Sequence, residues 1–360
     1  MAEIMLGLKA IKPSFSFGRM RALRLRNYVY LPLLAFLIVL VCFLLYHYPR
    51  SLERGVTKGV LLRHKSTYYS KNQELDDVLR RAIMPDRSVI LTMVNKSMAS
   101  PGSILDILLQ SFKSGDGTQR LLNHMVIITM DPHAFEYCRS LHPYCIHPSI
   151  FPHHFVTKRG SIITTPDQNL FTWTRNDVLF EVIQLGYSII FTEADVLWLR
   201  SPLIKLNPSN ELTISCNVLS DGQSGSYLHG GGIFFLKANA ISLEFFKYWK
   251  LTKFMFPNDP AEESLCNTIK ARQDAADLYG FRAQLVNTSY FGGFCQPSKN
   301  MLREAYTIQA NCCDDLESKV HDLRIVLGDW IRFRNHASGV NALDKMDLRW
   351  PLKCSTRNYT

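Results

Sequence analysis

Residues 28–48 lack charge altogether: this stretch of 21 residues contains no Asp, Glu, Lys or Arg. Its centre, residues 31–45, is almost wholly aliphatic or aromatic, and Tyr28 and Tyr48 lie at its two ends. The length and the terminal aromatic residues are typical of a single membrane-spanning helix. The stretch ends without a small-residue cleavage site, which argues against a cleaved signal peptide. The alternative is a buried helix of a soluble domain.

The long C-terminal part of the chain lacks a net charge. The chain carries a formal net charge of +10, and residues 1–27 and 50–71 account for all of it, with six Lys or Arg and one Glu each. Residues 72–360 are therefore neutral. A neutral domain lacks the electrostatic footprint of a nucleic-acid-binding protein, so we do not expect nucleic acid as a partner. The basic flanks can instead attract anionic lipid headgroups.

The nine cysteines include no Cys-x-x-Cys pair, so a structural zinc site is not expected. Eight of them follow residues 28–48, as do three glycosylation sequons, which begin at Asn95, Asn287 and Asn358. Both features fit an oxidising luminal compartment. The expected organisation is a basic cytosolic tail at residues 1–27, a transmembrane signal-anchor at 28–48, a stem at 49–73 and a luminal domain at 74–360.

The luminal cysteines are expected to be structural. Cys138 and Cys145 flank a short loop, and Cys295 with either Cys312 or Cys313 would staple the C-terminal part. Eight cysteines allow many pairings, so the sequence leaves the connectivity open.

Predicted strands and helices alternate along the luminal part, with no internal repeat and no low-complexity tract. Ser103 is a good helix N-cap, and Gly186 is a typical residue just after a helix. This alternation predicts an α/β fold with a mainly parallel sheet covered by helices on both faces. The expected strands are Ser88–Val94, Met125–Met130, Tyr187–Phe191, Leu212–Cys216 and Ile233–Leu236, and the expected helices are Ser103–Lys113, Asn176–Leu185 and Ile241–Phe254.

Two carboxylates follow the predicted strand Tyr187–Phe191, at Glu193 and Asp195. Ligands bind at the carboxyl ends of strands in open α/β sheets. In an extended segment, residues i and i+2 point the same way, so both acids could hold one divalent cation. Such a cation could neutralise a diphosphate leaving group. The alternative is a pair of acids on a solvated turn or at a helix end.

Several ordered segments together resemble one family. They are Ile90–Asn95, Ser103–Asp106, Ser111-Phe112, Val126–Asp131, Arg175 with Leu185-Gly186-Tyr187, Tyr290–Cys295, Asn311-Cys312-Cys313, Lys319–Arg324 and Asp329-Trp330. The chain from about Val89 to Trp330 is thus similar to plant Golgi nucleotide-diphospho-sugar transferases, a family that includes rhamnogalacturonan xylosyltransferases and extensin arabinosyltransferases. The resemblance implies a GT-A-like, Rossmann-type sheet, a UDP-sugar donor, anomeric retention and a divalent metal, usually Mn²⁺, held by an Asp-x-Asp motif.

The sequence departs from the family pattern at four places. Glu193-Ala194-Asp195 stands where the family has Asp-x-Asp, and His229–Gly232 replaces an Asn-Gly type of turn. Glu262 and Glu263 correspond to an Asp-Gln-Asp cluster, and Gln309 replaces a histidine. If that histidine is the family's third metal ligand, metal binding here is weakened. The departures indicate either an altered donor choice or lost catalysis.

The candidate site residues follow from the motifs and the resemblance. Each has a structural alternative: a solvated helix position for Lys319, a structural histidine for His321, a plain turn for residues 229–232 and an exposed helix start for residues 262–263. Asn95 is expected to be buried and unglycosylated. The predicted catalytic or sugar-facing residues are His229, Glu262 and Glu263; the predicted nucleotide-sugar ligands are Thr92, Asn95, Arg175, Gly231 and Lys319; the predicted metal ligands are Glu193, Asp195, Gln309 and His321.

Two functions remain open from the sequence. The first is a Golgi type II membrane protein that uses a divalent metal to move a sugar, a pentose, from a UDP-sugar to a cell-wall glycan or glycoprotein. The second is a non-catalytic member of the family that binds glycan or partner transferases in a complex.

Overall fold

The computed structural model describes residues 35–40, 73–151, 168–220, 226–255, 265–266, 269, 280–295, 301–313, 315–336 and 352–354. Side chains are described for these residues except 168–173, 217–220, 226–231 and 252–255. The chain divides into two units, residues 1–70 and 71–360. In the first unit the described residues 35–40 form a helix with exposed side chains.

No helix among the described residues is both long enough and apolar enough to cross a membrane. Most of the predicted span, residues 28–48, lies outside the described residues. The transmembrane helix, the tail and the stem therefore stay predictions.

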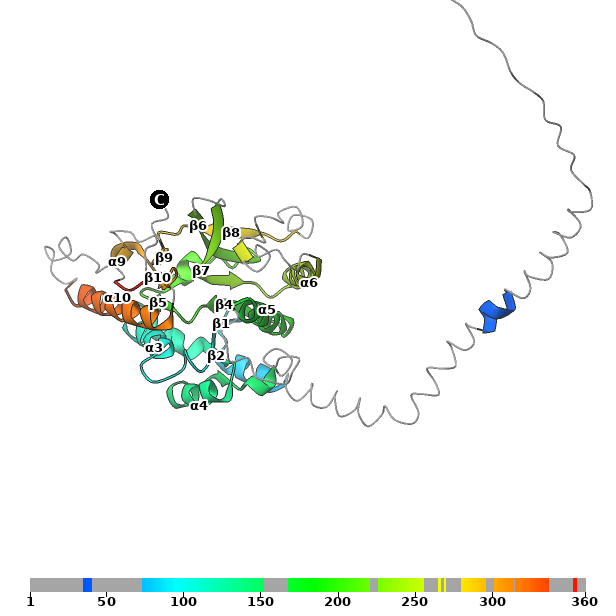
Figure 1. Cartoon of the computed structure of the whole chain (residues 1–360), viewed down its shortest axis with the longest axis horizontal. Helices are drawn as coiled ribbons and strands as arrows, with labels where there is room; N and C mark the ends of the chain where they lie inside the picture. Colours follow the sequence, from blue (N-terminus) through cyan, green and yellow to red (C-terminus); the bar gives the residue numbers. More distant parts are fainter. Residues whose placement is uncertain are drawn as a thin grey trace, which may run out of the picture. The chain divides into compact units, whose positions relative to one another are not determined.

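A seven-stranded sheet forms the centre of the second unit, in the order β3-β2-β1-β4-β7-β6-β8 (Figure 1). β3, β2, β1 and β4 are parallel, β8 is parallel to β6, and β7 is antiparallel to both of its neighbours. The inner strands are near-continuous apolar runs, as expected where both faces of a parallel sheet are covered. The strands are β1 (Ser88–Val94), β2 (Met125–Thr129), β3 (Cys145–Ile146), β4 (Ser188–Thr192), β6 (Leu212–Ser220), β7 (Ser226–Leu236) and β8 (Ala283–Val286).

A smaller sheet has the order β5-β10-β9 and consists of β5 (Val196–Trp198), β10 (Thr307–Gln309) and β9 (Phe291–Gly293). β10 runs antiparallel to β5 and pairs Gln309 with Val196. This pairing places the residue after Asp195 beside a strand more than a hundred residues further along the chain.

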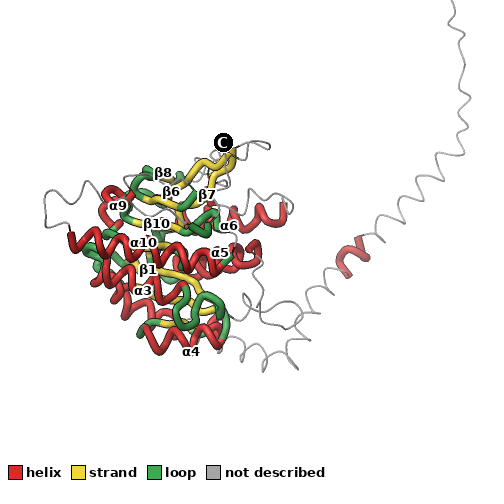
Figure 2. The backbone as a smooth tube through the Cα atoms, turned by 60° about the vertical axis from the view of Figure 1, so that its left-hand side comes forward, coloured by secondary structure: helices red, strands yellow, loops and turns green. Residues whose placement is uncertain are grey.

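Helices cover both faces of the large sheet (Figure 2). One core cluster joins that sheet to α3, α10 and the small sheet, and it includes Trp198 stacked on Phe112 with ring centroids 4.3 Å apart. The other cluster joins the opposite face to α5, α6 and a helix over residues 73–82. The helices are α3 (Ile104–Ser114), α4 (Pro132–Leu141), α5 (Gln168–Gln184), α6 (Ala240–Met255), α9 (Met301–Glu304) and α10 (Leu316–His336), with short 3₁₀ helices at Gln119–His124, Pro148–Ile150 and Pro202–Lys205.

The expected α/β class with a mainly parallel sheet is confirmed, as a GT-A-like arrangement requires. β1 has the predicted bounds, Ser103 precedes α3, and Gly186 after α5 has a φ of +84°. The prediction of a turn at His229–Gly232 is wrong, because these residues belong to β7. β6 and β7 extend the predicted strands by pairing with one another past a register shift between Ile214 and Cys216. Within β7, His229 and Gly230 pair with β6, whereas Gly232 lies beside the register shift with a φ of +72°.

Four disulfides join the described cysteines. Cys138 pairs with Cys145, as the short loop suggested. Of the two partners predicted for Cys295, Cys312 is the one that forms the bond. The other two bonds are Cys216–Cys266 and Cys313–Cys354.

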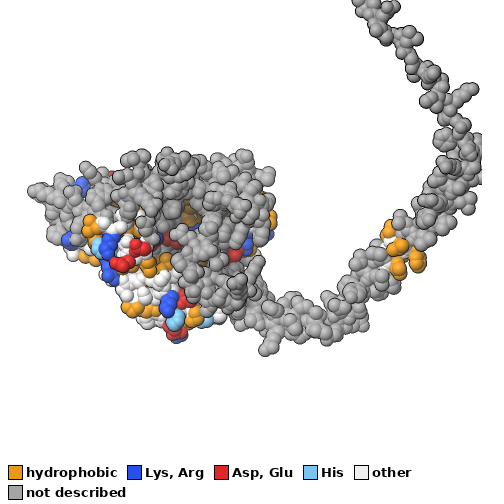
Figure 3. All heavy atoms as spheres, in the orientation of Figure 1, with side chains coloured by type: hydrophobic (Ala, Val, Ile, Leu, Met, Phe, Trp, Pro, Cys, Tyr) orange, Lys and Arg blue, Asp and Glu red, His pale blue; other side chains and the backbone are white. Residues whose placement is uncertain are grey.

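Acidic and basic side chains among the described residues lie near one another on the face shown in Figure 3. This mixture agrees with the neutral charge of residues 72–360.

Candidate functional site

The two carboxylates lie at the carboxyl end of β4, as predicted. Glu193 directly follows the strand, and Ala194 and Asp195 form a turn before β5. The segment is therefore not extended, and the expectation of an extended conformation is wrong, although the charge of Asp195 still acts on Glu193. The turn gives Glu193 and Asp195 different partners, which we call the Glu193 half and the Asp195 half of the site.

The Glu193 half consists of Glu193 and Arg175. Arg175, from α5, places Nη1 2.6 Å from Glu193 Oε1, and its guanidinium lies over the Phe191 ring at 5.4 Å. Burial raises the pKa of Glu193 and the nearby negative charge of Asp195 adds to this, while the Arg175 guanidinium opposes it. The carboxylate is thus held by a cation in a partly dehydrated setting, with 23% of its side chain exposed.

The Asp195 half consists of Asp195, Lys319 and Gln309. Lys319 Nζ from α10 lies 2.5 Å from Asp195 Oδ2, and Gln309 Nε2 from β10 donates to Asp195 Oδ1 over a long 3.4 Å. Burial disfavours the charged form of Lys319, but the Asp195 and Glu193 carboxylates outweigh it and raise the pKa of this lysine. Lys319 is therefore a protonated cation at neutral pH.

Gly232 lies between the two halves. Its carbonyl accepts a hydrogen bond from the Glu193 N–H at 2.7 Å, and its φ is +72°. A Cβ on this residue would approach Val196 Cγ2 to 2.6 Å and Gln309 Cδ to 2.7 Å. The residue is therefore a glycine for two reasons, the left-handed backbone and the lack of space.

The donor set suits a hard divalent cation. Beside the carboxylates of Glu193 and Asp195 lies the amide of Gln309, whose Nε2 faces Asp195 and whose buried Oε1 has no hydrogen-bond partner among the described residues. Carboxylate and amide oxygens are ligands that Mg²⁺, Ca²⁺ and Mn²⁺ prefer. Within the described ranges, no group of three or more His, Cys, Asp or Glu is placed to hold a metal. A cation here would thus bind between two carboxylates and an amide, in competition with Lys319.

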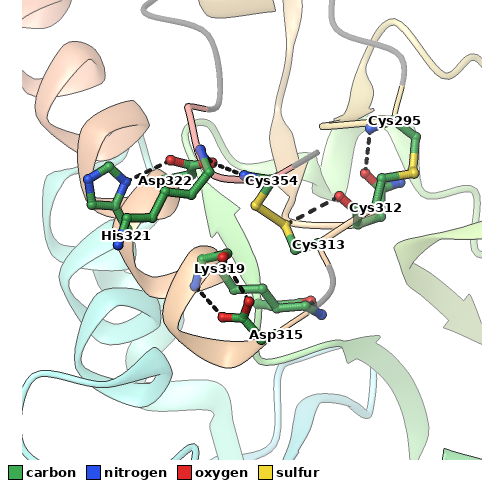
Figure 4. The surroundings of a disulfide bond; sticks show 12 residues. Cys295, Cys312, Cys313, Asp315, Lys319, His321, Asp322 and Cys354 are labelled. Carbon is green, nitrogen blue, oxygen red and sulfur yellow. Dashed lines mark hydrogen bonds and ion pairs between the residues drawn. A yellow bond between two sulfur atoms is a disulfide. The ribbon is translucent and has the colours of Figure 1, made fainter. Parts of the chain in front are cut away.

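The predicted metal ligand His321 lies elsewhere. Its Nδ1 is 2.8 Å from Asp322 Oδ1 on the same helix, and Figure 4 shows the ring directed toward that carboxylate. No contact joins His321 to Glu193 or Asp195 among the described residues. His321 and Lys319 are two apart on α10, and residues at that spacing do not share a helix face. The assignment of His321 as a metal ligand is therefore not supported by this geometry.

The two nucleotide ligands predicted at the end of β1, Thr92 and Asn95, are buried and half-buried. Thr92 is fully buried within the sheet, and its hydroxyl has no partner among the described residues. Asn95 is half-buried rather than buried, so that expectation is wrong. Its side-chain oxygen accepts from the Ser97 hydroxyl at 2.7 Å and the Met98 N–H at 3.1 Å, because the amide stabilises the turn after β1.

Four predicted residues are described only partly or not at all. His229 and Gly231 belong to β7 by their backbone, and His229 pairs with Asn217 of β6. Glu262 and Glu263 lie outside the described residues.

Two contacts of the site were not predicted. The Arg175–Glu193 and Lys319–Asp195 ion pairs both depend on packing between elements. The closeness of Gln309 to Asp195 agrees with their prediction as ligands of one metal. The pairing of β5 with β10 gave no periodic signal, because each strand has three residues. The sequence did offer one signal for these contacts. Arg175 and Lys319 both lie in the segments that resemble the family, so each of the two acids had a candidate cationic partner.

The sequence relatives are plant proteins. The chain is 32% identical to the uncharacterised protein At4g15970 of Arabidopsis thaliana over 77% of this chain and 72% of the relative. It is 31% identical to a second uncharacterised Arabidopsis thaliana protein, At1g28695, over 75% and 79% of the two chains.

Among solved structures, similarity extends to glycosyltransferases at low identity. The galactosyltransferase LgtC, in complex with donor and acceptor sugar analogues, is 12% identical, with 66% of this chain and 95% of that chain covered and a TM-score of 0.38. A glycosyltransferase involved in glycosylation of the major capsid of PBCV-1 is 9% identical, with 66% and 100% covered and a TM-score of 0.39. TM-scores below 0.5 do not define the fold or the site.

The family match is more specific, because it covers the site itself. Residues 120–323 match the family described as nucleotide-diphospho-sugar transferase, a range that includes Arg175, Glu193, Asp195, Gln309 and Lys319. This range is more than half of the chain. The protein belongs to the nucleotide-diphospho-sugar transferase family.

Proposed function

We propose that the protein transfers a sugar, a pentose, from a UDP-sugar to a cell-wall glycan or glycoprotein, with retention at the anomeric carbon. The observation that carries this proposal is the pairing of Asp195 with Lys319 at 2.5 Å beside the Glu193–Arg175 pair at 2.6 Å. Two acids and two cations thus meet at the carboxyl end of β4, the edge where α/β sheets bind ligands.

The reaction breaks the bond between the sugar's anomeric carbon and the diphosphate oxygen and forms a bond from that carbon to an acceptor hydroxyl oxygen, which loses its proton. Negative charge develops on the departing UDP. Lys319 and Arg175 are the described cations of the site that can meet this charge. Positioned cations in a partly dehydrated site stabilise such charge more than they would in water. The planar guanidinium of Arg175 suits two phosphate oxygens, and the ammonium of Lys319 acts as a point charge.

A divalent metal, Mn²⁺, is the proposed cofactor. When bound, it would supply Lewis-acid stabilisation of the diphosphate. Asp195, Glu193 and Gln309 Oε1 are the residues that would hold it. With Asp195 among the residues that hold the metal, the ammonium of Lys319 would be available to contact phosphate.

The proposed location is the Golgi membrane, with a single span at residues 28–48 and the domain after it in the lumen. The uncharged span, the luminal cysteines and the sequons support this. Protease treatment of sealed microsomes should leave the C-terminal domain intact until detergent is added. Digestion without detergent would place the domain in the cytosol.

The activity test is a screen of UDP-sugars with the full chain in detergent, with and without Mn²⁺, measuring UDP release. We expect one UDP-pentose to give release in the presence of Mn²⁺, and Asp195→Asn to lose it. Release that is equal in the parent and in Asp195→Asn would refute the site assignment.

The second candidate function is a non-catalytic binding protein in a transferase complex. It is favoured by the observation that both acids already have cationic partners while Gln309 offers an amide in place of an imidazole. This function predicts UDP binding or glycan binding by the full chain without release of UDP from any donor.

A further inference from the structure

We infer that residues 352–354 form a strap that positions Lys319 toward the donor diphosphate, and that Asp322 is the positioning residue that holds the strap. This inference rests on the proposed function, because it concerns how the same site is kept in place. The strap, Leu352-Lys353-Cys354, lies against α10 (Figure 4).

The first link of the strap is Asp322. This carboxylate is fully buried on α10, and its Oδ2 accepts backbone N–H donors from Lys353 at 3.0 Å and from Cys354 at 2.7 Å. His321 binds Oδ1 at 2.8 Å. Burial alone would raise the pKa of Asp322, but the Cys354 N–H, the His321 ring and further backbone donors hold it below the usual range. The carboxylate is therefore ionised and bound to the strap, since a buried charge requires such partners.

The second link is covalent. The Cys313–Cys354 disulfide fastens the strap to the short segment between β10 and α10. Cys313 and Asp322 lie on either side of Lys319 in the sequence, so the strap spans the helix turns that carry this lysine. A third contact, between Lys353 and Glu317 at 3.0 Å, is largely exposed and contributes little.

The burial of α10 explains why its first turns need a strap. From Asp322 onward the helix has fully buried side chains, including Leu323, Val326 and Trp330, which belong to the core cluster with α3. Residues 315–321 contain no fully buried side chain, and only the partly buried Leu316 and Val320 pack against the same cluster. Hydrophobic packing thus holds the later turns more firmly than the turn with Lys319, which is also held by the contacts at its two flanks.

The consequence for the site is geometric. Lys319 must reach Asp195 with its Nζ, and a misplacement of about 1 Å in a catalytic arrangement can cost roughly a hundredfold in rate. Asp322 and Cys354 touch neither Asp195 nor Gln309 among the described contacts, so they act through the position of α10.

The test compares two double variants of the full chain. Cys313→Ser with Cys354→Ser removes the disulfide of the strap, and Cys138→Ser with Cys145→Ser removes a disulfide between α4 and β3 as the matched control. The readout is acylation of the Lys319 amine by a water-soluble reagent, relative to the exposed Lys113, measured by mass spectrometry. We expect Lys319 labelling to rise several-fold in the strap variant and to stay at the parent level in the control.

A second variant keeps the disulfide. Asp322→Asn preserves the shape of the side chain and weakens its bonds to the strap N–H groups, so Lys319 labelling should rise as well. Lys353→Ala removes only the exposed ion pair and should leave labelling unchanged. Equal Lys319 labelling in the parent, the strap variant and Asp322→Asn would overturn the inference, even if one of these variants were less stable.

Binding of UDP, measured by calorimetry, separates this inference from the proposed function. We expect about tenfold weaker binding in the strap variant, a difference of about 1.4 kcal/mol, and parent-like binding in the control. Absence of UDP binding in the parent would refute the proposed function, while the labelling comparison would still decide the inference.

Discussion

The two halves of the site are built in different ways. In the Glu193 half, Arg175 is 18 residues before Glu193, on the helix that leads into β4. In the Asp195 half, Gln309 and Lys319 are 114 and 124 residues after Asp195. The Glu193 half forms once α5 packs beside β4, whereas the Asp195 half requires the C-terminal elements to be in place. The acid of the Asp195 half is also the more buried one, with 8% of the Asp195 side chain exposed against 23% for Glu193.

The largest effect is expected when the Asp195 half loses its acid. Asp195→Ala should abolish Mn²⁺-dependent UDP binding and destabilise the fold by roughly 3–5 kcal/mol, because it leaves the Lys319 ammonium unpaired in a buried setting. Urea unfolding and calorimetric titration with UDP measure the two effects.

Asp195→Asn separates binding from stability, because the amide keeps the shape of the side chain. The exposed Glu304→Gln removes one negative charge elsewhere and serves as the control. A folded Asp195→Asn protein that binds UDP and Mn²⁺ like the parent would show that this half is not the site.

The next effect concerns the cation of the same half. Lys319→Met keeps the length of the side chain but removes the charge that would meet the diphosphate, and loss of one such donor lowers kcat by roughly 10²–10³. The rate of UDP release with saturating donor is the measurement. Lys113→Met, on the exposed side of α3, should retain the parent rate. Similar losses in both variants would point to a general destabilisation.

A smaller effect is expected from the third candidate ligand. Gln309→His should tighten Mn²⁺ binding by about tenfold, or about 1.4 kcal/mol, since a neutral imidazole is a stronger ligand than an amide oxygen. His321→Ala should leave the affinity for Mn²⁺ unchanged, because His321 binds Asp322. Manganese titration of both variants compares the positions, and a loss of affinity in His321→Ala alone would reverse the assignment.

The smallest effect is a pH dependence in the Glu193 half. The pKa of Glu193 is raised above its ordinary value of 4.5. The folded state therefore holds this proton more tightly than the unfolded state. The resulting stability is fully present below the ordinary pKa and is lost as the pH rises through the raised one. Glu193→Gln should remove this loss. The melting temperature of the variant should therefore rise relative to that of the parent as the pH increases from the ordinary pKa of Glu193 through the raised one. A constant difference between the two proteins across about pH 4 to 8 would contradict the raised pKa.

The same comparison explains what the sequence could predict. The apolar runs of β1 and β4 and the Ser103 start of α3 gave clear local signals, and they placed Glu193 and Asp195 at a strand end. The turn at Ala194–Asp195 could not be read, because it depends on the pairing of β5 with β10. That pairing joins segments of three residues that are far apart in the sequence, and such segments carry no periodicity.

The other correct and wrong predictions also depend on packing between elements that are far apart in the sequence. Lys319 and His321 were both candidates, and only the packing of α10 shows that Lys319 meets Asp195 while His321 meets Asp322. Asn95 was expected to be buried because a glycan at its sequon would conflict with a nucleotide-binding role, but it is half-buried and its amide stabilises the turn after β1. The turn predicted at His229–Gly232 ignored the long pairing with β6, which includes these residues in β7.

Gly232 has a consequence for the comparison of related sequences. Because a side chain at this position would collide with Gln309 and Val196, the three positions should covary. A relative with alanine or serine at position 232 should carry smaller residues at the positions of Gln309 or Val196. A relative that keeps this glycine and has histidine in place of Gln309 should have room for the imidazole. An alignment of the family can therefore sort its members by the space beside Asp195 before any of them is purified.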